Sequence, residues 1–408
     1  MKKVIIAATI LAAFGLATVL DGVGGLGLQD NPAIPAVWKN EKRIDAGFSL
    51  LGKTADVSGW KASDSEKFTY TDSGLEGLWF SYTDSISDYW YTVGLNTGVG
   101  ALDEPSTILK EWTDHNKSTL QQTDTKAYSA TGYALNLSVA RDFDLPTIGG
   151  LIGGVNLGIN SPASNSKETV KDNLSGVKVV TESSAKYDTY LTLGLGVAKA
   201  IDANQTLVVG QTLGTERKFV GGDITLTRTS GGSKTKTKTN GGSGYNDFIP
   251  AETALGYVYK VTDALEVAGT YVYNWGGKID YQAFDNKGND VGDAVESNLQ
   301  AYHGFGLAAD YVYSEFQVQG YINWAKGSKV VKNEDGDYIR TVGSNTTLDD
   351  DDKLVKGNDN TTLGINLLWT PGFAKVGTVG VGIENSKDVL GVDTTDSTTT
   401  ALFYTYLF

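Results

Sequence analysis

From about residue 43 to the end of the chain, apolar residues alternate with small or polar residues in segments of about ten positions. Side chains along a β-strand point alternately to opposite faces, so this alternation predicts strands with one apolar and one polar face. The phase is ambiguous only in the second segment. The fourteen predicted strands lie at 44–50, 75–82, 91–95, 133–139, 155–159, 191–197, 207–213, 255–259, 265–273, 305–311, 316–324, 363–369, 379–383 and 402–408.

The connections between these segments alternate in length. Six are short, and the seven longer ones, which are mostly polar, lie around 57–68, 100–127, 160–186, 217–248, 276–300, 326–360 and 385–397. Short turns on one side and long loops on the other are typical of an up-and-down barrel in an outer membrane. We therefore expect an all-β fold, a transmembrane antiparallel β-barrel of about 14 strands, formed by residues 42–408 of a bacterial outer-membrane protein.

The two faces of the predicted strands indicate what each would contact. Lipid cannot hydrogen-bond a backbone, so a spanning sheet must close, with its apolar phase toward lipid and its other phase toward the lumen. The residues predicted to line the lumen include Asn136, Asn156, Thr192, Gln317, Gln319, Asn323 and Asn366. Aromatic residues near strand ends predict interfacial girdles; they are Tyr89, Trp90, Tyr273, Trp275, Tyr311, Tyr313, Trp324 and Trp369. A large soluble β-sandwich, with these aromatics in its core, is the alternative.

The last strand carries the most specific pattern. The chain ends on ALFYTYLF, in which Leu402, Tyr404, Tyr406 and Phe408 share one face. This resembles the C-terminal strand that outer-membrane barrels present to the barrel-assembly machinery, and it predicts that machinery as a partner. We expect the strand to close the barrel by pairing near 43–52, with its four alternating side chains toward outer-membrane lipid.

The N-terminal residues predict export. MKK precedes an apolar run at 4–16, and Gly15 and Ala17 fit a signal-peptidase site, so we expect residues 1–17 to be a signal peptide. The run is too short for a spanning helix. The absence of cysteine excludes disulfides and thiolate metal sites. The net charge of −14 argues against nucleic acid as a partner, because binding phosphates requires a basic face.

Residues 18–41 are glycine-rich and then punctuated by proline, without strand alternation. They contain Asn31, Pro32 and Ala33 ahead of the first strand. This arrangement resembles the FadL/TodX family of outer-membrane transporters, in which an N-terminal hatch with an Asn-Pro-Ala motif plugs a 14-stranded barrel. The resemblance implies a plug at residues 18–41 and transport of long-chain fatty acids or hydrocarbons. A plain turn is the alternative interpretation of the tripeptide.

No pattern in the chain predicts an enzyme or a cofactor. His303 is in phase with lipid-facing residues and lacks the serine two positions later that a barrel phospholipase would need. The low-complexity stretch 231–242 favours a loop tip or projecting hairpin, whose lysines would reach lipopolysaccharide phosphates. The acidic run of Asp349, Asp350, Asp351 and Asp352 lacks the spacing of an EF-hand loop and predicts no metal site.

These observations predict an outer-membrane channel for passive uptake of hydrophobic small molecules. Two other functions remain open at this point. A general diffusion porin would agree with the polar lumen phase, and a non-transporting barrel would act in secretion or assembly.

Overall fold

The computed structural model describes residues 31–33, 42–56, 69–99, 107–111, 122–147, 149–172, 176–239, 244–285, 289–299, 301–326, 329–332, 338–341, 353–356, 359–371, 377–387 and 397–407. The regular secondary structure of these residues consists of β-strands. None of them belongs to a helix long and apolar enough to cross a membrane. The predicted signal peptide, Phe408, the acidic run 349–352 and most of the predicted plug lie outside the described residues.

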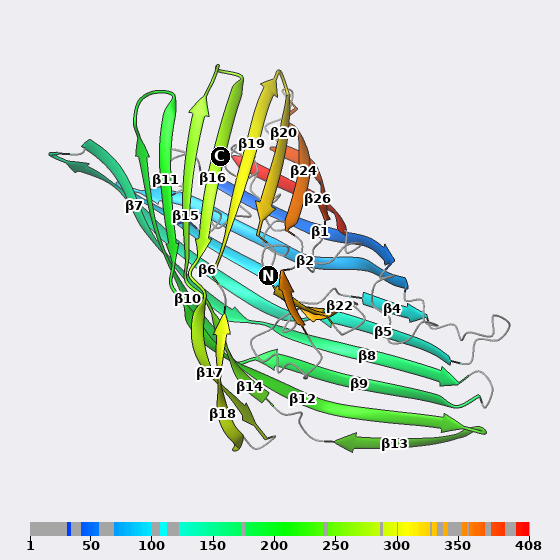
Figure 1. Ribbon diagram of the computed structural model, residues 1–408. Coiled ribbons are helices and arrows are strands. Elements are labelled where there is room, and N and C mark those ends of the chain that lie inside the picture. Colours follow the sequence, from blue (N-terminus) through cyan, green and yellow to red (C-terminus); the bar gives the residue numbers. More distant parts are fainter. Residues whose placement is uncertain are drawn as a thin grey trace.

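Fourteen antiparallel strands form a closed barrel (Figure 1). They are β1 (Arg43–Asp56), β2 (Thr69–Ile86), β3 (Tyr89–Val99), β6 (Gly132–Leu145), β7 (Gly149–Ser161), β10 (Tyr190–Ala200), β11 (Gln205–Thr212), β15 (Glu252–Lys260), β16 (Leu265–Asn274), β19 (Tyr302–Tyr313), β20 (Phe316–Ala325), β24 (Asn360–Trp369), β25 (Thr378–Lys387) and β26 (Ser397–Leu407). Each neighbours the next along the wall, and β26 pairs with β1, from Arg43 opposite Leu407 to Gly52 opposite Thr398. The prediction of fourteen strands closed by the C-terminal strand is confirmed.

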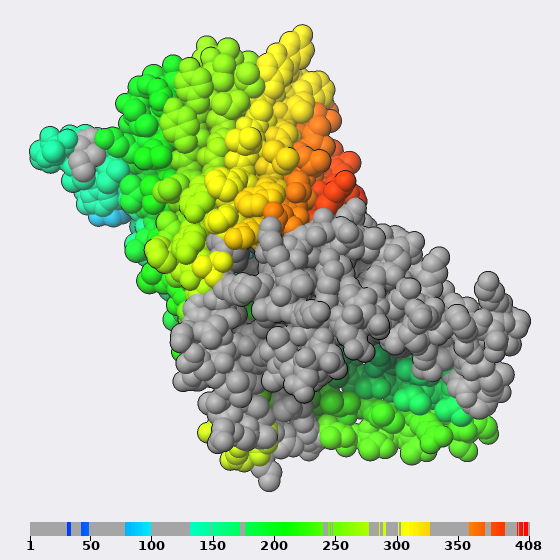
Figure 2. All heavy atoms as spheres, viewed as in Figure 1, coloured from blue at the N-terminus to red at the C-terminus, as the bar shows by residue number. Residues whose placement is uncertain are grey.

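The two faces of the wall differ as the alternation predicts. On β10, Leu191, Leu193 and Leu195 are exposed on the outside, whereas Gly194 and Gly196 are buried on the inside. Among the predicted lumen residues, Asn156, Gln317, Gln319, Asn323 and Asn366 are buried, and Asn136 and Thr192 are half-buried on the same face. Figure 2 shows the outer surface as closely packed from the green strands to the orange ones. The wall thus presents an apolar face outward and a polar or small-residue face inward.

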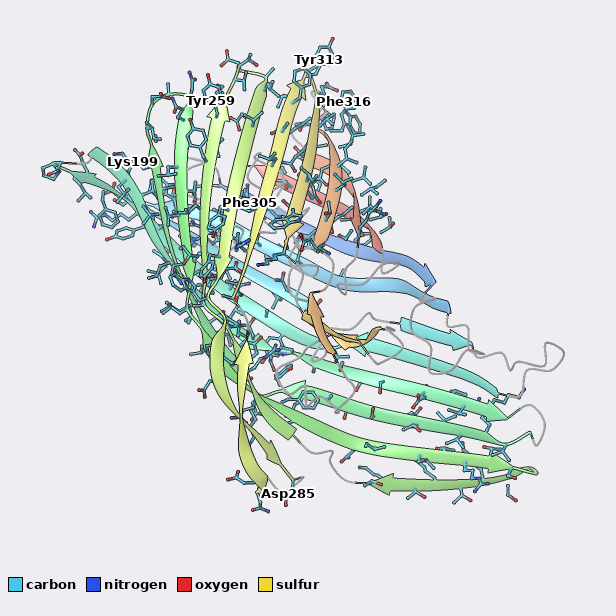
Figure 3. The ribbon with its side chains drawn as sticks, viewed as in Figure 1. Lys199, Tyr259, Asp285, Phe305, Tyr313 and Phe316 are labelled. Carbon is cyan, nitrogen blue, oxygen red and sulfur yellow. The ribbon has the colours of Figure 1, made fainter. Side chains whose placement is uncertain are left out.

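Aromatic side chains mark both ends of the outer apolar band. Tyr259, Tyr313 and Phe316 all lie at the end of the barrel with the short turns, and Phe305 lies further along the wall (Figure 3). Phe305 belongs to an outer cluster in which its ring centroid is 5.1 Å from that of Tyr271 and 5.7 Å from that of Trp324. His303 stands in the same cluster, 6.1 Å from Trp324, which confirms its outward position.

Trp90 is an exception among the predicted girdle residues. Its neighbour Tyr89 is 45 % exposed on the outside, whereas Trp90 is buried among lumen residues. Adjacent residues of a regular strand point to opposite faces, so both cannot belong to one girdle. The assignment of Trp90 to the girdle was therefore wrong.

A β-bulge explains the ambiguous phase of the second predicted strand. Ser49 on β1 pairs with Gly77 on β2, but the next residue, Leu50, pairs with Leu75. One extra residue of β2, Glu76, therefore lies opposite this step, and the alternation changes phase there.

The long connections are largely strands that extend the wall. They are β4 (Thr107–Glu111), β5 (Gln122–Ala130), β8 (Ala163–Asp172), β9 (Lys178–Tyr187), β12 (Thr215–Ser230), β13 (Ser233–Thr239), β14 (Gly244–Ile249), β17 (Gly277–Phe284) and β18 (Asp290–Leu299). They pair in the series β2–β4–β5–β8–β9–β12–β14–β17–β18, and β13 pairs with β12. β21 (Lys329–Lys332), β22 (Tyr338–Thr341) and β23 (Lys353–Lys356) form a small separate sheet.

The low-complexity stretch forms a hairpin, one of the two structures predicted for it. Gly231 and Gly232 make the turn between β12 and β13 with φ angles of 54° and 83°, which favour glycine. Figure 1 shows β5, β8, β9, β12 and β13 running side by side beyond the barrel. We call the sheet formed by these five strands the extension.

A charge placed in the middle of the outer face should destabilise the barrel. Ile365 on β24 is 52 % exposed between the outward-facing Leu363 and Leu367. We expect Ile365→Lys to lower the free energy of unfolding in lipid vesicles by about 2–4 kcal/mol, because the ammonium would lie in hydrocarbon. Asn385→Lys, also on the outer face but near the long-connection end of β25, should cost less than about 1 kcal/mol. Urea titration followed by tryptophan fluorescence would measure both, and equal effects would contradict a lipid-facing position for Ile365.

Candidate functional site in the barrel lumen

The Asn31–Ala33 segment lies inside the barrel. Asn31 and Ala33 are 3 % and 0 % exposed. The side-chain amide of Asn31 donates a hydrogen bond of 2.8 Å to the carbonyl oxygen of Val209 on β11, and its Oδ1 accepts one of 2.9 Å from the backbone N–H of Ala33. The second bond is the local asparagine turn that Asn-Pro sequences favour, and the first fixes this turn to the wall. The structure therefore shows a turn that is hydrogen-bonded to the lumen wall, and the role of the tripeptide in a plug stays a prediction.

Two glycines make room for this segment. A Cβ atom added to Gly196 on β10 would overlap Oδ1 of Asn31 and lie 2.7 Å from Cδ of Pro32. One added to Gly154 on β7 would lie 2.9 Å from Cβ of Pro32. Both glycines are on the lumen face, so only residues without a side chain fit where the backbone and the segment approach so closely. The sequence pattern does not distinguish these two glycines, because many glycines occupy lumen positions.

One sector of the lumen wall, from β3 to β19, carries most of the small and apolar side chains of the lumen, beside polar residues such as Asn156 and Asp310. Its buried cluster comprises Ala33 of the docked segment and Trp90, Ala140, Ile152, Ala198, Val208, Ala254, Ala268, Val272 and Ala308 of the wall. Val258 and Tyr321 pack against this cluster. We call this part of the wall the apolar sector. Ala33 of the docked segment packs against the apolar sector.

The rest of the wall, from β20 through β26 to β1 and β2, is polar inside. The Asn366 amide donates to Oε1 of Gln319 over 2.8 Å, and the Tyr321 hydroxyl donates to Oε2 of Glu384 over 2.8 Å. These groups are mostly buried. The first bond joins the neighbouring strands β24 and β20, and the second joins β20 to β25 across β24, so the buried polar groups have the partners that they require. We call this part of the wall the polar sector.

A buried ion pair lies where the polar sector closes the barrel. Nε of Arg43 is 3.1 Å from Oδ2 of Asp45, and both side chains are at most 2 % exposed. The hydroxyl of Ser81 on β2 donates to Oδ2 of Asp45, and that of Thr405 on β26 donates to its Oδ1, over 3.1 and 2.8 Å. Asp45 on β1 thus joins the first, second and last strands.

Several buried donors in the lumen have no hydrogen-bond partner among the described residues. They are the indole N–H groups of Trp79 and Trp90 and the hydroxyl of Thr270. The residues are between 6 % and 8 % exposed and point inward from β2, β3 and β16. Such groups normally find a partner in protein, water or ligand, so they offer hydrogen bonds to a molecule inside the barrel.

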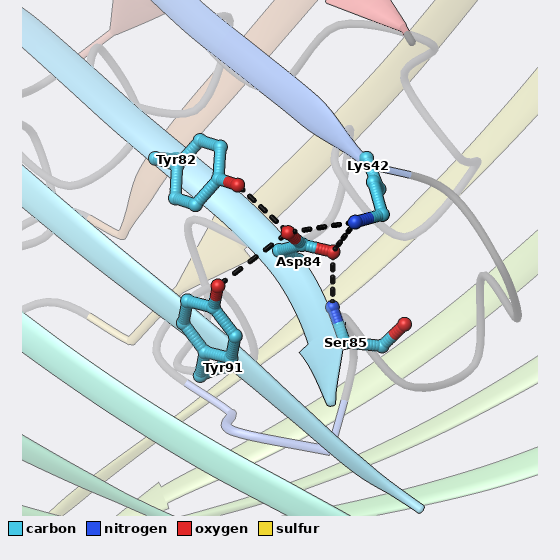
Figure 4. A network of polar contacts seen from close by, with 5 residues as sticks. All are labelled: Lys42, Tyr82, Asp84, Ser85 and Tyr91. Carbon is cyan, nitrogen blue, oxygen red and sulfur yellow. Dashed lines mark hydrogen bonds and ion pairs between the residues drawn. The ribbon is translucent and has the colours of Figure 1, made fainter. Parts of the chain in front are cut away.

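A second polar network, which the sequence analysis did not identify, lies on the outer phase near the short-turn end (Figure 4). Asp84 is 7 % exposed. Its carboxylate accepts hydrogen bonds from the Tyr82 hydroxyl at 2.7 Å and the Ser85 N–H at 2.6 Å, and it forms an ion pair with Lys42 at 2.9 Å. The network ties the start of β1 to the end of β2.

The predicted insertion strand has the expected orientation where it is described. Leu402 and Tyr404 are exposed on the outer face, Tyr406 is half-buried, and Thr405 between them is buried inside. No group of three or more His, Cys, Asp or Glu side chains able to hold a metal ion occurs among the described residues.

A closed barrel with an apolar outer band, aromatic ends and a polar and small-residue lumen is a transmembrane β-barrel. No protein-family profile and no curated protein matches the sequence. Several solved structures do match the fold. A FadL homologue from Pseudomonas aeruginosa is 11 % identical, with 98 % of this chain and 97 % of that chain covered and a TM-score of 0.59.

Two hydrocarbon transporters are similar as well. The toluene transporter TbuX of Ralstonia pickettii is 11 % identical, with 98 % of this chain and 99 % of that one covered at a TM-score of 0.57. The toluene transporter TodX of Pseudomonas putida is 12 % identical, with 98 % and 97 % covered at a TM-score of 0.53. The resemblance predicted from the Asn-Pro-Ala tripeptide and the strand count is confirmed as a FadL-like barrel fold.

Proposed function

We propose that this protein is a bacterial outer-membrane channel for passive uptake of hydrophobic small molecules, such as long-chain fatty acids or hydrocarbons. The observation that carries the proposal is the Asn31–Ala33 segment docked in the lumen against the apolar sector. The likeness in fold to a FadL homologue and to toluene transporters supports the same class of cargo. In this proposal residues 1–17 are a signal peptide, residues 18–41 are the plug and residues 42–408 are the barrel.

The proposed path follows the apolar sector. An apolar molecule leaves water for a wall of alanine, valine and isoleucine side chains, which is favourable in proportion to the area buried. A polar end group would accept hydrogen bonds from Trp79, Trp90 and Thr270, whose donors have no partner in the described part of the chain. The molecule meets the plug at Asn31–Ala33, where Pro32 fixes the backbone and Ala33 allows close packing. It then leaves when the plug shifts.

Proteoliposomes containing the purified protein would test this function. We expect them to take up radiolabelled oleate or toluene faster than empty liposomes and to show almost no swelling in small sugars, because a plugged lumen excludes bulk water. Swelling in arabinose, together with oleate uptake no faster than in empty liposomes, would contradict the proposal.

A general diffusion porin is the second candidate. The buried Gln317, Gln319 and Asn366 of the polar sector favour it, because a water-filled pore requires polar lining. Their amides bond to neighbouring wall side chains, such as that of Asp310 at 2.7 Å from Gln317. The sugar-swelling measurement above separates the two functions.

Insertion of the barrel has its own proposed partner. Leu402, Tyr404, Tyr406 and Phe408 would be presented to the barrel-assembly machinery as the closing strand.

A further inference from the structure

Lysines from three strands of the extension lie in one row across the sheet. Lys171 on β8 pairs with Lys178 on β9. Lys178 also pairs with Thr229 on β12, and Thr229 pairs with Lys234 on β13. Directly paired residues project from the same face of a sheet, so Lys171, Lys178 and Lys234 share a face. All three are exposed.

The rows next to it are also basic. Lys167 on β8 pairs with Glu182 on β9. Glu182 pairs with Thr225 on β12, and Thr225 pairs with Lys238 on β13. Lys236 lies between Lys234 and Lys238 on the same phase of β13. The seven lysines of this face are Lys167, Lys171, Lys178, Lys186, Lys234, Lys236 and Lys238. We call it the lysine face.

The lysine face is continuous with the outer surface of the barrel. Tyr133 on β6 pairs with Ser161 on β7. The Thr131 N–H then donates a 2.7 Å hydrogen bond to the Ala163 carbonyl, and beyond it β5 pairs with β8, so the ladder of hydrogen bonds runs without a break from the barrel into the extension. Ser164 points inward and is buried. Lys167 points to the same side as the outward-facing Val155 and is exposed. The lysines therefore point away from the lumen.

The protein itself neutralises little of this charge. Lys167 has Glu182 at 3.2 Å and Lys238 has Asp223 at 2.6 Å. The other five lysines of the face have no acidic partner among the described residues. Like charges placed directly opposite, as at Lys171 and Lys178, destabilise a sheet unless an anion lies between them. The concentration of positive charge occurs in a chain of net charge −14, so composition alone does not account for it.

We propose that the lysine face binds the phosphate groups of lipopolysaccharide in the outer leaflet. The face begins next to the end of the apolar band: Lys186 pairs with Ala163, two residues beyond Ser161, which is about 7 Å along a strand. It continues to Lys171, ten residues beyond Ser161, or about 34 Å along the strand. The phosphates of lipopolysaccharide lie at and above the surface of the outer leaflet, so these negative charges lie beside the lysine face. The position on the lateral wall favours this source over a soluble polyanion.

The test uses the purified protein in detergent micelles and fluorescently labelled lipopolysaccharide. We expect the triple variant Lys171→Gln/Lys178→Gln/Lys234→Gln to bind at least about tenfold more weakly than the wild type, since each lysine near an anionic surface contributes to attraction. The wild-type affinity should fall as salt is raised. The variant Lys171→Arg/Lys178→Arg/Lys234→Arg keeps the charge and should bind within about threefold of the wild type.

A matched control removes the same charge elsewhere. Arg141, Lys199 and Lys260 lie near the short-turn ends of β6, β10 and β15, at the opposite end of the barrel from the extension. The variant Arg141→Gln/Lys199→Gln/Lys260→Gln should bind lipopolysaccharide like the wild type. The proposal would be overturned if both glutamine variants bound equally weakly, or if the lysine-face variant bound like the wild type. It would also be overturned if the wild type bound dephosphorylated lipopolysaccharide as tightly as the phosphorylated form. Tighter binding of soluble heparin than of lipopolysaccharide would overturn the choice of source. Heat-dependent migration on gels would establish that each variant is folded.

Discussion

Replacing Gly196 with alanine is expected to raise the ion conductance of bilayers that contain the protein severalfold, without unfolding the barrel. The added Cβ would occupy the position of the Asn31 side-chain oxygen and press on Pro32. Asn31 would then lose its 2.8 Å hydrogen bond to the Val209 carbonyl, and the segment would leave the wall. If residues 18–41 are the plug proposed above, its displacement opens a water path through the lumen. Conductance of single channels in planar bilayers would measure the change.

The control is a second lumen glycine. Gly94 on β3 faces the lumen too, but a Cβ there would meet its nearest atoms only at 3.8 Å, an ordinary contact. Gly94→Ala should therefore conduct like the wild type. Asn31→Ala, which removes the hydrogen bond without filling the wall, should reproduce the effect of Gly196→Ala. If both Gly196→Ala and Asn31→Ala conduct like the wild type, residues 31–33 do not block the lumen.

Replacing Asp45 with alanine is expected to destabilise the closed barrel by about 3–5 kcal/mol. The substitution removes the carboxylate 3.1 Å from the buried Arg43 guanidinium. It also removes the acceptor for the hydroxyls of Ser81 and Thr405, so the contact among the first, second and last strands is lost. Chemical unfolding in lipid vesicles, followed by tryptophan fluorescence, would measure the loss.

An exposed ion pair serves as the comparison. Lys167 and Glu182 are 3.2 Å apart, with side chains 58 % and 49 % exposed, so Glu182→Ala should cost less than about 1 kcal/mol. The double variant Arg43→Leu/Asp45→Leu should recover much of the stability lost in Asp45→Ala, because it leaves no buried charge. Similar losses for Asp45→Ala and Glu182→Ala would show that the seam does not depend on the buried pair.

The alternation of residue types was sufficient to predict the barrel. A strand exposes successive side chains to opposite faces, so Leu191, Leu193 and Leu195 mark a lipid-facing surface without knowledge of any partner strand. The requirement for closure in lipid then makes β26 the partner of β1. The same logic failed at Trp90, because aromatic character near a strand end was given more weight than the phase.

Apart from the projecting hairpin that was one of two interpretations of 231–242, the extension was not predicted, because its strands lack this pattern. On β13, lysine alternates with threonine, and neither face is apolar, so the sequence resembles a polar loop. Pairing with β12 makes it a strand, and pairing depends on residues distant along the chain. The lysine face has the same origin, since Lys171 and Lys234 are 63 positions apart and become neighbours in one row only through the registers of β8, β9, β12 and β13.

By itself, the sequence determined the number of barrel strands, the face that all but the second of them turn toward lipid, and the strand that closes the barrel. These properties follow from side-chain periodicity along a single strand and from the physics of the bilayer, which are local and general. Only the tertiary structure decided that Asn31 reaches the carbonyl of Val209 and that Gly196 makes room for it. Asn31 and Val209 are separated by 178 positions, and no periodicity specifies which distant backbone groups will meet.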